Sequence, residues 1–160
     1  MNTIVQTYSP EDVVFTICDY KIQDWDEIRI TPSEPSFKRI KGINGKGTRV
    51  RCTSKNSATI DFSILQTSEA NNVLTEIHRQ DMMYGTGRLE VSIKDLSGQT
   101  HITSFEAYLE SAPILTFKDS VELIEWTLIC ESLESMNTGG NASLTEVVLK
   151  KISEKIKNIF

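Results

Sequence analysis

Alternation of apolar and polar residues runs through most of this chain and predicts β-strands. It is clearest from Ala58 to Leu65, where Ile60, Phe62 and Ile64 would share one face of a strand. Strands are also predicted at 13–18, 27–31, 89–94, 102–110 and 121–131, with a short edge strand at 114–117. The apolar parity shifts within 102–110, which indicates a bulge, and it slips again within 121–131.

Two segments have helical spacing instead. The first begins after Ser68, a good N-cap residue, and is expected to run to about Met83, just before Gly85. The second opens with the capping box Ser143-Leu-Thr-Glu146. It carries an apolar stripe and, on its other side, four lysines: Leu144, Val147, Val148, Ile152, Ile156 and Ile159 against Lys150, Lys151, Lys155 and Lys157.

Hairpin turns without βαβ alternation predict the fold class: mainly β (α+β), an antiparallel β-barrel or sandwich with one packed internal helix and a C-terminal amphipathic helix. At 160 residues the chain is predicted to be one domain, long enough to bury a core. We expect this domain at 1–135, a flexible link at 136–141 (MNTGGN) and the C-terminal helix at 142–160. No apolar run approaches a membrane span, and the N-terminus lacks the pattern of a signal peptide.

Charge is unevenly distributed along the chain, and one segment is strongly basic. Residues 37–55 hold seven of the seventeen Lys and Arg residues and no acid, whereas the rest of the chain has ten bases against twenty-two acids. The centre of this stretch, Gly42 to Gly47, is a turn sequence between extended residues. We therefore predict a basic β-ribbon at about 36–56, called the arm below, whose tip reaches away from the body.

Catalytic and ligand-binding motifs are not found. The arm fails as a phosphate loop, because Ile40 stands where the first glycine belongs and Gly47 stands where Ser or Thr is required. His78 and His101 lie in no recognisable triad motif. The three cysteines are far apart and predict neither a disulfide framework nor a metal site. Nucleic-acid binding by the arm is disfavoured by its one aromatic residue, Phe37, and by a pI of about 5.1.

Several motifs, taken in order, carry a family resemblance. Tyr8 to Phe15, YSPEDVVF, resembles the YxPxDVxV start of the tail tube proteins of contractile-tailed bacteriophages and related phage-tail-like particles. Ser57 to Leu74 is similar to that family's strand-then-helix signature, GxIxxxLxQTSxxNxxL, with Ser57 in the region of the usual glycine. Shorter matches follow at 91–98, 107–113 and 125–128, so the resemblance covers residues 8–131.

This resemblance implies a structural subunit without catalysis or cofactor. Such subunits form stacked hexameric rings whose strands close a barrel around a channel, which serves DNA delivery or membrane puncture. Implied partners are further copies of the chain and the tail sheath and baseplate proteins, with DNA only as a transient passenger and no membrane binding. The implied location is the inner tube of the virion tail, after assembly in the host cytoplasm.

The resemblance also assigns roles to residues. The ring-stacking arm would use Lys38, Arg39, Lys41, Gly42, Asn44, Gly45, Lys46, Arg49 and Arg51. Its acidic counter-surface on the next ring would be Asp24, Asp26, Glu27 and Glu34, and the lumen would be lined by Thr59, Asp61 and Ser63. Two alternatives stay open: a monomeric nucleic-acid-binding β-barrel that uses the same arm, and the tube protein of a type VI secretion system.

Overall fold

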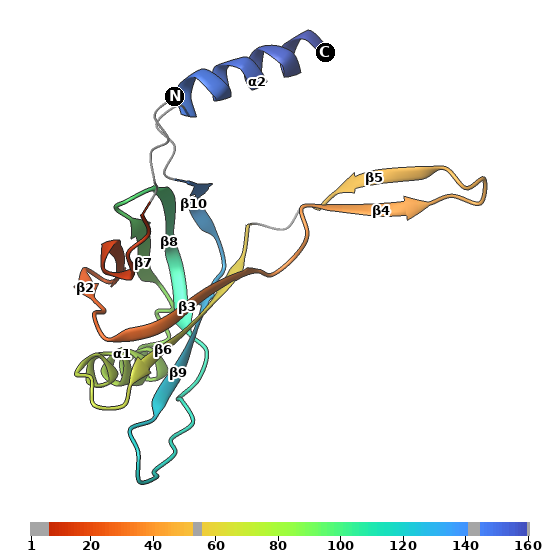
Figure 1. Ribbon diagram of the computed structural model, residues 1–160. Helices are drawn as coiled ribbons and strands as arrows, with labels where there is room; N and C mark the ends of the chain where they lie inside the picture. Colours follow the sequence, from red (N-terminus) through yellow and green to blue (C-terminus); the bar gives the residue numbers. More distant parts are fainter. Residues whose placement is uncertain (1–6, 53–55, 141–144, 160) are drawn as a thin grey trace.

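A computed structural model describes residues 7–52, 56–140 and 145–159, the last range with side chains from Lys150 onward. Within these ranges, ten strands and two α-helices follow a short 3-10 helix at Pro10–Asp12 (Figure 1). The first half of the chain contains β1 (Val13–Ile17), β2 (Tyr20–Lys21), β3 (Trp25–Pro32), β4 (Phe37–Lys41), β5 (Gly47–Arg51) and β6 (Ala58–Leu65). The second half contains α1 (Ala70–Tyr84), β7 (Leu89–Asp95), β8 (Gln99–Leu109), β9 (Leu123–Cys130), β10 (Leu133–Gly139) and α2 (Thr145–Ile159).

Eight of the strands form one antiparallel sheet in the order β2-β1-β7-β8-β9-β6-β3, and β10 also pairs with β8. The sheet curls strongly, since Phe15 of β1 and Phe62 of β6 meet edge to face with ring centroids 5.0 Å apart. Three strands separate β1 from β6 in the pairing order, so only a curled sheet brings these rings together. The sheet is nevertheless not closed, because β2 and β3 are its two ends. The β-rich α+β class is confirmed, with an open rather than a closed sheet in the described part of one chain.

The core fills the concave side of this sheet. Alternate residues of the strands point inward, as the sequence predicted for Ile60, Phe62 and Ile64, which are at most 2% exposed. Helix α1 adds Ala70 and Leu74 to this core. The largest buried side chain is Trp126 of β9, which is 2% exposed. Clean alternation therefore marks strands that have one face on this core.

Helix α1 is joined to the sheet through Asn71. Its side-chain amide donates to the carbonyl oxygens of Leu65 (2.9 Å) and Ser68 (3.2 Å), while its Oδ1 accepts the indole N–H of Trp126 at 3.0 Å. Ser68 Oγ accepts a bond from the Ala70 N–H at the start of the helix. At the other end Gly85 takes a left-handed conformation (φ 61°), the usual glycine C-cap. The predicted helix at 68–83 is thus confirmed within two residues.

Replacing Asn71 by alanine is expected to destabilise the fold by about 1–3 kcal/mol, because the buried Trp126 N–H would lose its acceptor. Urea unfolding followed by tryptophan fluorescence measures the change in the free energy of unfolding. Asn72→Ala is the matched control, since Asn72 is an exposed neighbour on the same helix. Equal stability of the two variants would contradict the role given to Asn71.

Three predictions about local structure are wrong. Residues 114–117 form no strand but lie in a loop at 110–122, where their side chains are exposed. No parity slip occurs in β9, because the strand begins at Leu123 and all its even-numbered residues are buried. Most of the predicted link at 136–141 belongs to β10, where Met136 pairs with Ile102 and Gly139 pairs with Gln99. The backbone of β8 supplies the hydrogen bonds, so this strand forms without an apolar pattern of its own.

Two parts of the chain extend from this body (Figure 1). Strands β4 and β5 form a separate two-stranded sheet, and helix α2 stands apart from the main sheet. The side chains of α2 from Lys150 to Ile159 are exposed. No helix within the described ranges is long and apolar enough to cross a membrane. The division of the chain into a β domain and a separate C-terminal helix stays a prediction.

Candidate assembly surfaces

The arm is a regular β-hairpin with every residue of its two strands exposed. Phe37 pairs with Arg51 at its base, and Lys41 pairs with Gly47 next to the turn. The turn is closed by bonds from Gly42 N to Lys46 O (2.9 Å) and from Gly45 N to Gly42 O (3.0 Å), with Gly45 at φ 78°. The predicted β-ribbon is therefore confirmed as a structure, while its role in ring stacking stays a prediction.

Register gives the arm two chemically different faces, since directly opposed residues of antiparallel strands point the same way. One face is cationic: Arg39 is opposite Arg49, and the Arg49 guanidinium lies 4.2 Å from the centroid of the Phe37 ring. Such a cation–π contact orients a guanidinium without neutralising it. Gly47 leaves room on this face, because a Cβ there would clash with the Arg39 side chain.

The opposite face of the arm is partly apolar. It presents Ile40, opposite Thr48, and Val50, opposite Lys38. Ile40 and Val50 are 58% and 42% exposed, and Ile43 at the turn is fully exposed. The basic composition concealed this apolar face, which becomes visible only when the register of the hairpin is known.

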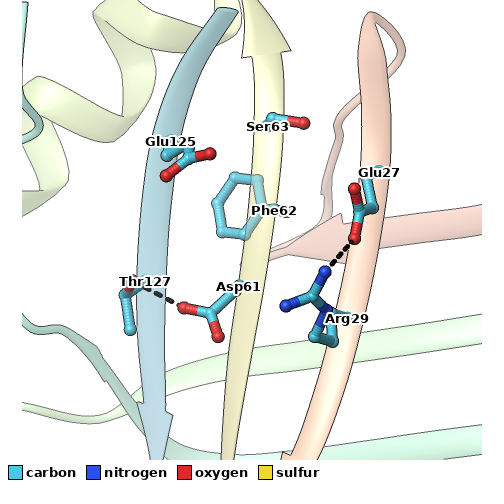
Figure 2. A pocket seen from close by; sticks show the side chains of 7 residues that line it. All are labelled: Glu27, Arg29, Asp61, Phe62, Ser63, Glu125 and Thr127. Atoms are coloured by element: carbon cyan, nitrogen blue, oxygen red, sulfur yellow. Dashed lines mark hydrogen bonds and ion pairs between the residues drawn. The ribbon is translucent and has the colours of Figure 1, made fainter.

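A second candidate surface is the convex face of β3, β6 and β9, shown in Figure 2. The predicted lumen residues Thr59, Asp61 and Ser63 alternate with core residues, and all three point to this face. Across β6, Asp61 is opposite Arg29 on one side and Thr127 on the other, and Ser63 is opposite Glu27 and Glu125. These side chains surround a shallow hollow of about 280 Å³.

Acids outnumber bases on this convex face. Glu27, Asp61 and Glu125 carry three negative charges, and Arg29 carries one positive charge, which leaves a net charge of −2 around the hollow. Arg29 Nη2 lies 2.8 Å from Glu27 Oε1, and Thr127 Oγ1 donates to Asp61 Oδ1 at 2.8 Å. The face is thus polar and carries a net negative charge.

The same face continues onto β8, where Tyr108 is opposite Ile129. The Tyr108 hydroxyl donates to Glu131 Oε1 at 2.9 Å. This hydrogen bond, together with burial and the nearby negative charge, raises the pKa of Tyr108 above its usual value. Tyr108 therefore stays a neutral donor at physiological pH and adds no charge to the face.

Three of the four acids predicted as a counter-surface lie at the start of β3 or just before it and Glu34 lies beyond its end, and their role in ring stacking stays a prediction. Asp24, Asp26 and Glu27 line three different hollows, with a β-bulge between Trp25 and Glu27. Glu27 belongs to the convex face with the lumen candidates. Glu34 lies at the base of the arm, in a hollow that Arg49 and Arg51 also line. The length of β3 separates Glu34 from the other three acids.

Residues with catalytic potential are dispersed. His101 Nε2 lies 3.0 Å from Thr103 Oγ1 on β8. Cys18 is exposed in a turn and Cys130 is buried, and burial raises the pKa of the Cys130 thiol. In the described ranges, no three His, Cys, Asp or Glu side chains form a group able to hold a metal ion.

Proteins similar to this chain in sequence or fold come from phages and phage-like particles. No family model matches the chain. It is 29% identical over 150 residues to "Structural protein ORF10" of Pseudomonas phage KPP10, a match that covers 87% of this chain and 86% of that protein. A chain in the anti-feeding prophage cap, described as the AFP tube terminating cap, has a TM-score of 0.57 at 11% identity, covering 85% of this chain and 97% of that one.

Another match comes from the PVC sheath/tube terminator of an extracellular contractile injection system, in the extended state. Its TM-score is 0.55 at 12% identity, with 82% of this chain and 97% of that chain covered. This chain has the fold of proteins found in contractile injection systems. A chain in the virion of a native gene transfer agent shares the fold as well, with a TM-score of 0.57 at 9% identity over 81% of this chain and all of that one. The resemblance to phage-tail proteins is thus confirmed at the level of fold.

Proposed function

We propose that this chain is a structural subunit of a phage tail or a related particle, and that it assembles into stacked hexameric rings around a central channel. The observation that carries the proposal is the arm, an exposed two-stranded hairpin on a protein with this fold. A lone hairpin is marginally stable in water, so it is expected to become fully ordered only against a partner.

The convex face fits the wall of the channel. Its negative net charge repels phosphate groups, which lets DNA pass without being held. The open ends of the sheet, β2 and β3, would pair with neighbouring subunits and so remove exposed strand edges. In this role the chain performs no catalysis and needs no cofactor. Its partners are copies of itself, the tail sheath and the baseplate, and its place is the inner tube.

A second candidate is a protein that ends such a tube. It is favoured because two of the structures with this fold are described as a tube terminating cap and a sheath/tube terminator. A terminator would form the same kind of ring but would not continue into a stack. A tube subunit and a terminator both require a ring around a channel.

Negative-stain electron microscopy of the purified full chain, over a range of concentrations, tests both candidates. Hollow tubes of uniform width are expected for a tube subunit, and single rings that do not grow are expected for a terminator. A monomer at every concentration that binds oligonucleotides with a steep salt dependence would overturn both in favour of nucleic-acid binding.

A further inference from the structure

The arm leaves the main sheet at one end of β3, β6 and β9, and a second exposed segment leaves it at the opposite end. At the arm's end, Ala58 is paired with Pro32 and with Cys130. At the other end, Leu65 of β6 is paired with Leu123 of β9. There β9 is preceded by the loop 110–122. Figure 1 shows the arm and this loop leaving the sheet in different directions.

The loop end of the sheet is unusually apolar for a surface. Ile114, Phe117 and Val121 are 88%, 80% and 62% exposed. The strand-end pair Leu65 and Leu123 adds two more half-exposed leucines. The loop is tied to the end of β6 by the hydrogen bond from Gln66 N to Glu122 O at 3.0 Å. Several large exposed apolar side chains in one loop and at the strand ends beside it indicate a contact surface. We call the loop 110–122 with Leu65 and Leu123 the loop end.

Charge at the loop end is opposite to that of the arm. The loop has three acids, Glu110, Asp119 and Glu122, and one base, Lys118, for a net charge of −2. Lys118 is held 3.6 Å from Glu122. Residues 37–51 of the arm have six bases and no acid, for a net charge of +6. The arm also offers Ile40, Ile43 and Val50 as apolar contacts. The two surfaces therefore match in both hydrophobicity and charge.

The other exposed apolar surfaces match the arm less well. Residues 150–159 of α2 have four lysines against Glu154, a net charge of +3, so they would repel the arm. The end of α1 exposes Met82, Met83 and Tyr84, but residues 79–84 have one base and one acid and offer no net attraction.

We infer that the arm of one subunit docks on the loop end of a second copy of this chain. This inference rests on the proposed function and adds the identity of the receiving surface, which differs from the acidic residues predicted from the sequence. Because the two surfaces lie at opposite ends of the same strands, the contact is head to tail. A heterologous contact of this kind repeats in one direction, so it generates a stack.

Site-specific cross-linking tests the contact. Two single-cysteine variants of the full chain, Ile43→Cys and Phe117→Cys, would be prepared in a background with Cys18→Ser and Cys52→Ser, which leaves only the buried Cys130. The variants are mixed under assembly conditions, oxidised mildly and analysed on a non-reducing gel. A disulfide-linked dimer is expected in the mixture and at most in traces with either variant alone.

The matched control replaces Phe117→Cys by Leu96→Cys, because Leu96 is also well exposed (62%) but lies in the β7–β8 turn, away from the loop end. Stacked rings that form without the Ile43–Phe117 cross-link, or with a stronger Ile43–Leu96 cross-link, would overturn the inference and leave the proposed function intact. Absence of rings and stacks with the unmodified chain would overturn both.

Reversal of charge at the loop end gives a second readout. The double variant Glu110→Lys, Asp119→Lys is expected to lose stacking while keeping the unfolding temperature of the parent. Glu134→Lys on β10, an exposed reversal elsewhere, is expected to stack normally. Normal stacking by the double variant would overturn the inference.

Discussion

Replacing Lys38, Arg39, Lys41 and Lys46 together by glutamate is expected to stop the chain from assembling without unfolding it. The four reversals change the net charge of residues 37–51 from +6 to −2. A single exposed ion pair contributes only about 0–1 kcal/mol. Reversal also turns attraction into repulsion, and the effect is repeated at every subunit of a ring. The body should remain folded, because all four side chains are exposed and lie outside the core.

Electron microscopy and sedimentation velocity measure assembly of this variant, and circular dichroism with thermal unfolding measures its fold. The matched control is Lys38→Arg, Lys41→Arg, Lys46→Arg, which changes side-chain shape at three of the same positions but keeps every charge. This control is expected to assemble. If the glutamate variant forms tubes as readily as the control, the role of the arm in stacking is wrong.

The second large effect is expected on the convex face. The double variant Glu27→Lys, Glu125→Lys changes the net charge around the hollow from −2 to +2. If this face lines the channel, every ring gains a belt of positive charge, and assembled tubes should retain DNA that the parent tubes release. Loss of the exposed Glu27–Arg29 ion pair should cost little stability.

Retention is measured by co-sedimentation of assembled tubes with a short DNA duplex. Binding by the variant should weaken by about 10³- to 10⁵-fold between 50 and 200 mM salt if six to ten phosphates are contacted. Glu69→Lys at the N-cap of α1 with Glu76→Lys in its first half provides a control with the same charge change on the core side of the sheet. DNA retention by this control alone would show that the convex face does not line the channel.

Sequence patterns predicted those parts of the fold in which one face of an element is buried. Ile60, Phe62 and Ile64 alternate because β6 lies on the core, and Leu74 has helical spacing with Ala70 because α1 packs on the same core. The arm was found through different signals, its glycine-rich turn and its lack of acids. In each case the feature that determines the structure is visible in residues that are close together in the sequence.

The wrong predictions concern segments in which the local sequence pattern is absent or misleading. Ile114, Leu115 and Phe117 are apolar but exposed, so this segment has the composition of a strand that does not form. Strand β10 is polar and exposed beyond Leu133, and it is held by backbone bonds to β8 that no side-chain pattern reports. The bulge between Trp25 and Glu27 assigns Glu27 to the convex face, and such a register is a property of two paired strands. The apolar face of the arm was not predicted either, because it also depends on the register of two paired strands.

The separation of charge between arm and body has a kinetic consequence. The chain has a net charge of −5, so the part outside residues 37–51 has a net charge of −11 against +6 on the arm. A subunit with this distribution has a large electric dipole, which orients it during diffusion toward a complementary surface and raises the association rate. The Debye length falls from about 10 Å at 0.1 M salt to about 3 Å at 1 M. Subunits should therefore add to a growing assembly fastest at low ionic strength. Added salt should lower the association rate of each subunit more than it weakens an apolar contact that has already formed.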